Sequence, residues 1–239
     1  DFIRDFRRVD PDWEATLRPS TIPTTPGLYG PDGVSLLSIR QSRLGTTAAI
    51  PMGGSSATGQ FEFDLFGVGA NAGKTTFRLR QAWVAWGPVL IGQTNSVFMD
   101  GDLFPHIIDY SGPPGMVFLR GPQLRLTLRD RDGVKVAVAL ERATTQIDVG
   151  NIRTLDPALG NNLRSRTPLP DLTAQLRLTG AWGSFQLSGL LTKLAYDTQY
   201  TPGNQPSGSR LGWGINAGAA INGGAATVLN EIVEGRPVG

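Results

Sequence analysis

The sequence predicts an all-β protein of 239 residues, and within that class an antiparallel up-and-down transmembrane β-barrel. Apolar and polar residues alternate with a period of two through most of the chain, which is the period of a half-buried strand. The segments that alternate are long, mostly near the length of about 9–11 residues that a tilted strand needs to cross a bilayer. The connections between them are alternately long and short, as in a barrel with tight turns on one side and long loops on the other.

The alternation predicts about ten or eleven strands. The clearest runs are Phe61–Leu65, Leu124–Leu128 and Leu172–Leu178, in which every second residue is apolar. Each such run places apolar side chains on one face and polar or small side chains on the other. The predicted strands are residues 2–8, 34–48, 59–68, 75–86, 88–95, 117–129, 133–143, 171–181, 183–194 and 210–221, with 225–233 as the eleventh.

The connections and the tryptophans favour a membrane barrel over a soluble sandwich, whose strands would alternate similarly. Trp83, Trp86 and Trp182 lie close to short turns, where aromatic rings suit the interface between lipid and water. The long connections are residues 9–33, 96–116, 144–170 and 195–209, and the short ones are Gly87, Asp130–Asp132, Trp182 and Asn222–Gly224.

The composition excludes several classes of function. The chain has no cysteine, which excludes a disulfide scaffold, a cysteine zinc site and a cysteine nucleophile. It has one histidine, His106, which makes a Ser-His-Asp hydrolase a poor candidate. The net charge is +2 with acidic and basic residues interleaved, which argues against nucleic-acid binding. We therefore expect no enzyme activity, no cofactor and no nucleic-acid partner.

Two motifs resemble binding sites without matching them. Gly69–Thr75 is similar to a phosphate-binding P-loop, but Val68 stands where the first glycine is needed. The residues after it alternate like a strand, so we predict a hairpin loop. Asp100, Asp102 and Asp109 lack the spacing and the glutamate of an EF-hand loop, so we expect no metal site.

Arginines recur on the polar faces of the predicted strands. Arg78 and Arg80 share one face, and Arg125, Arg129 and Arg177 lie on the polar faces of their strands. An arginine that faces lipid at mid-bilayer costs about 2–4 kcal/mol, so the polar faces are expected to line the lumen. A basic wall of this kind would select anionic solutes.

The register of the segment 34–48 is ambiguous from its residues alone. Leu37 and Ile39 would place Arg40 inside the barrel, whereas Leu36 and Leu44 would place Arg43 inside.

The long segment Asn95–Arg120 is too apolar to extend into solvent. We predict that it folds into the lumen and narrows it, with aspartates facing the arginine wall. The alternative is a loop that packs on a neighbouring subunit. The residues assigned to this constriction loop are Phe98, Asp100, Asp102, His106, Asp109 and Arg120.

Two stretches resemble known porins. Ser42-Arg43-Leu44-Gly45 is similar to a segment common in trimeric general porins. A longer pattern resembles the DcaP-like porins of Gram-negative outer membranes, well over residues 34–129 and more loosely to about 221. It runs Arg78-Leu-Arg80-Gln-Ala-Trp83, Trp86-Gly, Gly92-Gln-Thr, Phe98-Met-Asp100, Phe104-Pro, Asp109, Gly112-Pro-Pro-Gly115, Val117-Phe, Arg120 and Pro122-Gln-Leu-Arg125.

The resemblance implies a sixteen-stranded homotrimeric barrel in the bacterial outer membrane, with its third loop folded into the pore. It also implies passive diffusion of small, preferably anionic solutes such as dicarboxylates. It favours Arg43 over Arg40 as the residue in the pore. The expected pore-lining set is Arg43, Arg78, Arg80, Arg125 and Arg177.

The chain departs from this family pattern in strand number, in lacking an N-terminal helical extension, and in ending with Gly-Arg-Pro-Val-Gly239. We therefore expect a single porin-like domain, residues 1–239, that is incomplete at both ends. The alternative function is a soluble or secreted all-β module that binds a ligand through its long loops.

Overall fold

The computed structural model describes residues 1–16, 21–104, 117–144, 147–222 and 227–238, with side chains described as far as residue 222. The chain divides into two compact units, and each is described by itself. The first contains the described part of residues 1–87, residues 92–94 and Phe104, and the second contains residues 88–91, 95–103 and the described part of 117–239.

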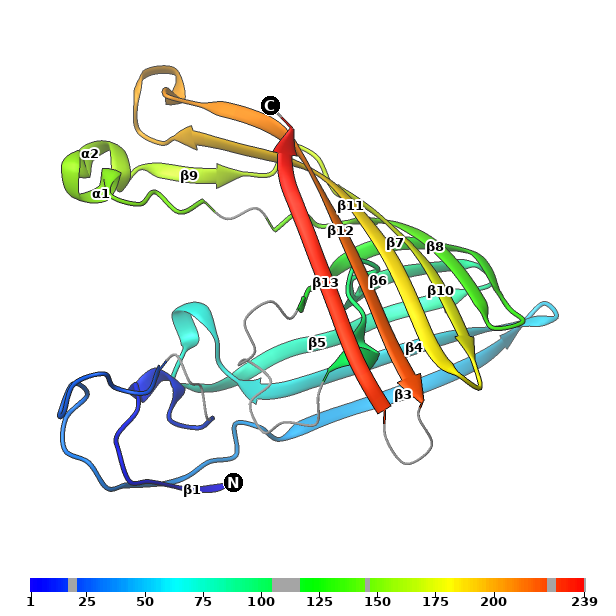
Figure 1. The fold of residues 1–239 in the computed structure, drawn as a ribbon, viewed down its shortest axis with the longest axis horizontal. Helices are drawn as coiled ribbons and strands as arrows, with labels where there is room; N and C mark the ends of the chain where they lie inside the picture. Colours follow the sequence, from blue (N-terminus) through cyan, green and yellow to red (C-terminus); the bar gives the residue numbers. More distant parts are fainter. Residues whose placement is uncertain (17–20, 105–116, 145–146, 223–226, 239) are drawn as a thin grey trace. The chain divides into compact units, whose positions relative to one another are not determined.

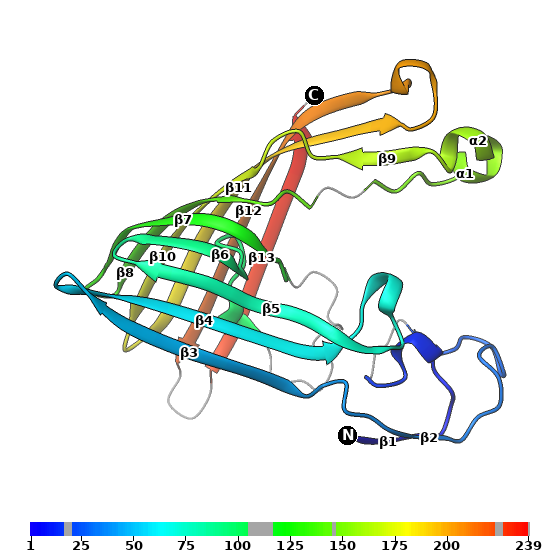
Figure 2. The same cartoon turned by 180° about the vertical axis from the view of Figure 1, so that it is seen from behind.

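The first unit is built on an antiparallel meander of three long strands, which lie side by side in Figure 2. Ahead of the meander, two short strands form a separate antiparallel pair in which Phe2 lies opposite Leu37. The elements are β1 (Phe2–Asp5), η1 (Pro11–Trp13), β2 (Val34–Leu37), β3 (Arg43–Met52), β4 (Ser55–Phe66), η3 (Gly69–Asn71) and β5 (Thr75–Trp86).

Strand β6 (Val89–Asn95) is divided between the units. In the first unit the side chain of Gln93 donates a hydrogen bond to the carbonyl of Leu79 at 2.9 Å. In the second unit Pro88, just before β6, accepts a hydrogen bond from the amide of Thr127 at 2.8 Å.

The second unit is a longer antiparallel meander, in which β10, β11 and β12 run side by side (Figure 1). Among the described strands of this unit, β9 departs from sequential pairing, since it pairs with β11 while β8 pairs with β10. The elements are η4 (Gly101–Leu103), β7 (Arg120–Arg131), β8 (Val134–Glu141), α1 (Ile152–Leu155), α2 (Pro157–Gly160), β9 (Leu163–Arg166), β10 (Asp171–Gly180), β11 (Gly183–Thr198), η5 (Pro202–Asn204), β12 (Gly208–Asn222) and β13 (Thr227–Val238).

Burial in both units is the reverse of that in a water-soluble protein. On β12 the exposed positions include Leu211 and Ile215, whereas Asn216 on the other face is buried. On β4 and β5 the exposed face carries aromatic rings, and those of Phe63 and Phe77 stack with centroids 4.7 Å apart. Each strand thus exposes its apolar side chains and buries its polar ones. This arrangement suits a strand that faces lipid on one side. The predicted all-β antiparallel fold is confirmed.

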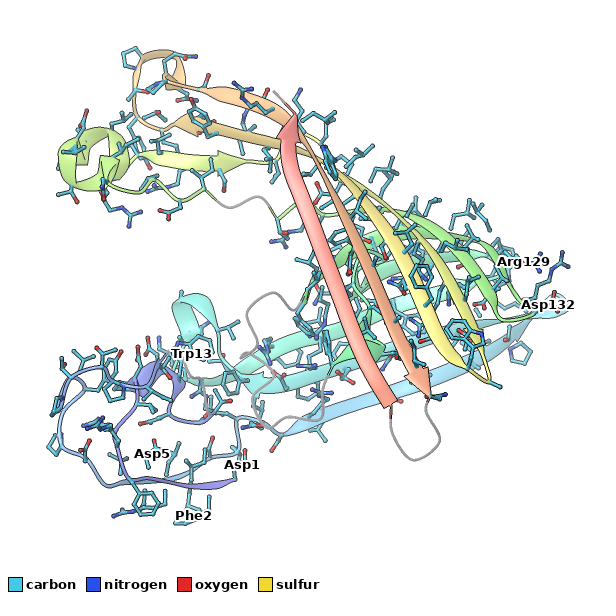
Figure 3. All side chains as sticks on the ribbon, viewed as in Figure 1. Asp1, Phe2, Asp5, Trp13, Arg129 and Asp132 are labelled. Carbon is cyan, nitrogen blue, oxygen red and sulfur yellow. The ribbon has the colours of Figure 1, made fainter. Side chains whose placement is uncertain are left out.

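The short hairpin between β7 and β8 follows the chemistry of its residues. Asp132 and Gly133 both have positive φ, +56° and +72°, as a two-residue turn between twisted strands requires. Asp132 also accepts a hydrogen bond from Arg129 at 3.1 Å at the tip of this hairpin (Figure 3).

Three predicted segments were assigned to the wrong kind of element. The segment 34–48 is not one strand, because the chain turns at residues 38–42, where the amide of Ser42 bonds to the carbonyl of Ile39. Residues 49–58, which fell between two predicted strands and were expected to connect them, belong to β3, the Gly53-Gly54 turn and β4, because Pro51 and the two glycines interrupt the alternation of Ile50 and Met52 in the sequence. Strand β9 lies inside the predicted loop 144–170, where Leu163-Arg-Ser-Arg has no apolar alternation.

Two β-bulges also overturn predicted faces. Each bulge adds one residue to a strand and so reverses the faces of the residues beyond it. Unbroken alternation from Phe77 and Leu79 would put Trp83 on the apolar face, but a register shift at Arg80 places it opposite Gln60, on the polar face. A second shift at Leu128 places Arg129 opposite Val136, on the face of Leu126 and Leu124 rather than on the polar face.

No helix among the described residues is long and apolar enough to span a bilayer.

The two faces of β7 give a direct test of this architecture. Leu126 is exposed on the apolar face, and Thr127 follows it on the polar face. We expect Leu126→Arg to lower the free energy of unfolding in lipid vesicles by about 2–4 kcal/mol, because a charge would enter hydrocarbon. The matched variant Thr127→Arg should cost below about 1 kcal/mol. Equal losses in urea titrations of the two variants would contradict the assignment of faces.

Candidate channel-lining site

The polar face of the first unit carries a network of ion pairs centred on Asp64. Asp64 Oδ1 accepts a hydrogen bond from Arg78 Nε at 2.8 Å, and its Oδ2 accepts from Arg78 Nη2 at 2.5 Å and Arg80 Nη1 at 2.8 Å. Arg80 Nε donates to Glu62 Oε1 at 2.8 Å. A two-pronged contact between arginine and carboxylate is among the strong hydrogen bonds in proteins. The antiparallel register, which sets Asp64 opposite Arg78, makes this contact possible.

Arg43 borders the network but is paired only weakly. Its Nε lies 3.7 Å from Glu62 Oε1, and its side chain is 54% exposed. Arg43 lies opposite Asp64 in the register of β3 and β4, which places it on the polar face. Among the three arginines of this face, Arg43 therefore keeps the most accessible charge.

Arg40 has a different environment, in the turn before β3. It is buried, its guanidinium lies 4.3 Å from the centroid of the Phe66 ring, and its Nη2 donates to the carbonyl of Gly67 at 3.3 Å. Burial lowers the pKa of Arg40, and the carboxylates of Glu14 and Asp12 oppose that shift. These contacts assign Arg40 to packing within the first unit.

In the second unit, two of the predicted arginines hold the start of the long loop. The carbonyl of Asn95 accepts hydrogen bonds from Arg125 Nη2 at 2.6 Å and Gln123 Nε2 at 2.9 Å. Asn95 Oδ1 accepts from Arg120 Nε at 3.2 Å, and the Arg120 guanidinium lies 4.9 Å from the ring centroid of Phe118.

Arg177 of β10 binds two loop aspartates. Its Nη1 donates to Asp100 Oδ1 at 2.9 Å, and its Nη2 donates to Asp102 Oδ2. Asp100 is buried, whereas the Asp102 side chain is 72% exposed. Gln186 Oε1 accepts a further hydrogen bond from Arg177 Nη1 at 3.2 Å, which orients the guanidinium toward the loop.

The residues that precede these aspartates cross the polar face of β10, β11 and β12. We call residues 95–103 the crossing segment. The carbonyl of Phe98 accepts a hydrogen bond from Asn216 of β12 at 3.0 Å, and the carbonyl of Met99 accepts one from Gln186 of β11 at 2.9 Å. Together with the Asp100 contact to β10, three consecutive loop residues bind three adjacent strands.

Apolar burial accompanies these bonds. The side chains of Val97, Phe98, Met99 and Leu103 are buried, and Gly214 and Gly218 on the covered face of β12 are buried as well. Glycines leave room for another backbone to approach the sheet closely. At the start of the crossing segment, the amide of Val97 donates to Glu141 of β8 at 2.9 Å.

The predicted pore-lining arginines have close partners within their own units. Arg78 and Arg80 are neutralised by carboxylates of β4, and Arg125 and Arg177 are bound to the crossing segment. Whether these arginines line a pore stays a prediction. Phe98, Asp100 and Asp102 lie in the crossing segment and Arg120 at the start of β7, while His106 and Asp109 fall outside the described residues.

Sequence reasoning missed the residues that bind these groups: Glu62, Asp64, Glu141, Gln186 and Asn216. Their signal was present, since polar residues at alternate positions of neighbouring strands share a face. Within the described residues, no group of three histidine, cysteine, aspartate or glutamate side chains is arranged to hold a metal ion.

Comparisons with known proteins agree with this geometry. The family model of the DcaP outer membrane protein matches residues 32–184. The crystal structure of the outer membrane channel DcaP of Acinetobacter baumannii is similar in fold, with a TM-score of 0.72 and 21% sequence identity. That match covers 97% of this chain and 61% of the solved channel, so this chain spans less than two thirds of the channel's length. A comparison with curated protein sequences found no match.

The network around Asp64 predicts unequal costs for removing its charges. We expect Asp64→Asn to lower the free energy of unfolding by about 2–4 kcal/mol, because Arg78 and Arg80 both lose a buried carboxylate partner. Water can solvate the charge of Arg78 only in part, since most of its side chain is covered. The control Arg43→Gln removes an exposed, weakly paired charge and should cost at most about 1 kcal/mol. Urea titration in lipid vesicles measures both, and a small loss for Asp64→Asn would contradict the central role of this carboxylate.

Proposed function

Because this chain belongs to the DcaP outer membrane protein family of the bacterial outer membrane, we propose that it forms part of a porin through which small solutes diffuse passively. The preferred solutes in this proposal are small anions of the dicarboxylate class. No catalytic step and no cofactor are included.

The observation that carries the anion preference is the charge on the polar face of the first unit. Three arginines, Arg43, Arg78 and Arg80, face two carboxylates, Glu62 and Asp64, which leaves one positive charge in excess. The excess is accessible at Arg43, since the other two guanidinium groups are bound to carboxylates. A fixed charge in a narrow channel biases the passage of small ions of opposite sign.

The crossing segment supports the second part of the proposal, a constriction. A chain bound across the polar face of β10–β12 occupies space that an unobstructed lumen would leave to water. We propose that residues 95–103 narrow the channel in this way, as the beginning of the predicted constriction loop.

The surroundings of the chain complete the proposal. Exposed apolar faces on both units suit contact with outer-membrane lipid. A homotrimer follows from the family resemblance alone, and native mass spectrometry of the detergent-solubilised protein would measure it. The competing function, a soluble ligand-binding module, predicts a protein that stays monodisperse without detergent.

The selectivity of the channel tests the proposal. In planar bilayers under a salt gradient, we expect Arg43→Glu to shift the reversal potential toward cation preference, because the accessible charge changes sign. Arg131→Glu, at the exposed end of β7, makes the same change of charge at a residue opposite Val134, on the apolar face, and should shift the potential much less.

Two outcomes would contradict this prediction. A protein that gives no conductance in the bilayer would refute the porin function itself. An unchanged reversal potential for Arg43→Glu in a conducting channel would refute only the proposed origin of the anion preference.

A further inference from the structure

We propose that Asp100 and Asp102, which bind the same arginine, have separate roles: Asp100 fixes the crossing segment to the wall, and Asp102 sets part of the charge that solutes meet. This division rests on the proposed channel function. It assigns Arg177 to positioning the loop rather than to binding solutes.

The environment of Asp100 is that of a structural anchor. The residue is 2% exposed, and its Oδ1 accepts hydrogen bonds from Arg177 Nη1 and from the backbone amide of Asp102 at 3.1 Å. The adjacent carbonyls of Phe98 and Met99 are bound by Asn216 and Gln186, both buried. Removing the Asp100 charge takes from Arg177 its buried carboxylate and leaves only the exposed Asp102 as a charged partner, so this loss should loosen the whole crossing segment.

The environment of Asp102 is that of a surface charge. It belongs to the short helical turn η4, and its side chain is 72% exposed although it contacts Arg177 Nη2. Ion pairs with an exposed member contribute little to stability, because water already solvates the charge. Loss of this carboxylate should therefore leave the segment in place.

The same change alters the local charge. Arg177 binds two carboxylates, Asp100 and Asp102, so these three residues together carry one net negative charge. Removing the accessible carboxylate brings that sum to zero. The accessible carboxylate of Asp102 thus lowers anion permeability by its charge, without any change in the position of the crossing segment.

Arg177 can serve both carboxylates because its guanidinium is a planar fork with donors on two sides. Gln186 accepts a hydrogen bond from the Arg177 Nη1 that binds Asp100, and its own amide donates to Met99. A lysine at position 177 would keep the charge and lose the fork, so it separates the two contributions.

The experiment compares Asp100→Asn, Asp102→Asn and Arg177→Lys with the unaltered protein in planar bilayers. For Asp102→Asn we expect the anion-to-cation permeability ratio to rise about two-fold, with unchanged open-channel noise. For Asp100→Asn we expect higher noise and higher single-channel conductance, because the segment is released. Arg177→Lys should also raise the noise, since the fork is lost while the charge is kept.

A double variant guards against a general folding defect. In Asp100→Asn/Arg177→Gln both charges are gone and an amide pair remains, so the noise should fall back toward that of the unaltered channel. Amide hydrogen exchange of residues 95–103 follows the anchor without any transport measurement. It should accelerate in Asp100→Asn and stay unchanged in Asp102→Asn.

The outcomes separate this inference from the porin function. Equal effects of the two asparagine variants on noise and exchange would overturn the division of roles, and so would slow exchange in Asp100→Asn. An unchanged permeability ratio in Asp102→Asn would overturn the role in selectivity. Absence of conductance in the unaltered protein would refute the porin function, while the exchange measurement would still decide the anchoring role of Asp100.

Discussion

The structure depends on one constraint: each strand has lipid on one side and water on the other. A strand between lipid and an aqueous interior must present apolar side chains to one and polar side chains to the other, while its backbone bonds to its neighbours. Exposed leucines and buried asparagine and glutamine side chains on β11 and β12 follow from that requirement. The same requirement collects charged residues on one face, where they must find partners among themselves.

That concentration of charge explains why the arginines are paired so thoroughly. Arg78, Arg80 and Arg177 each meet a carboxylate at hydrogen-bonding distance, and Arg125 binds a backbone carbonyl. An arginine count therefore overstates the field that a solute would meet on such a face. The residues that matter for a solute are those whose pairing is weak or whose partner is exposed, such as Arg43 and Asp102.

The period-two pattern predicted much of the fold because every residue of a two-faced strand contributes to the alternation. The hairpins of β7 with β8 and of β10 with β11 were predicted within a few residues. Strand β9 and the β3–β4 turn were not, since Leu163-Arg-Ser-Arg carries no apolar alternation, and Pro51 with Gly53-Gly54 interrupts the alternation of Ile50 and Met52. Bulges left no sequence signal, because an inserted residue such as Leu128 looks like any other.

Candidate site residues were predicted less completely, for a related reason. The sequence shows that Arg78 lies on the polar face of its strand, but only the register of β4 against β5 shows that Asp64 lies opposite it. Phe98 and Met99 make their contacts through backbone carbonyls, which every residue carries. No sequence motif can therefore predict these contacts. Asp100 and Asp102 were identified by their chemistry, and their common partner 75 or more positions later was not.

The bulge at Leu128 has a consequence for how such a wall can evolve. Because the bulge absorbs one residue, loss of the Leu128 codon would remove the bulge and leave Arg129 opposite Val136, with every other side chain on its present face. Short insertions and deletions in a strand are usually regarded as damaging events. In a strand with a bulge, the extra residue can be lost without changing the register, so a lineage could shorten this strand without moving any charge from one face to the other.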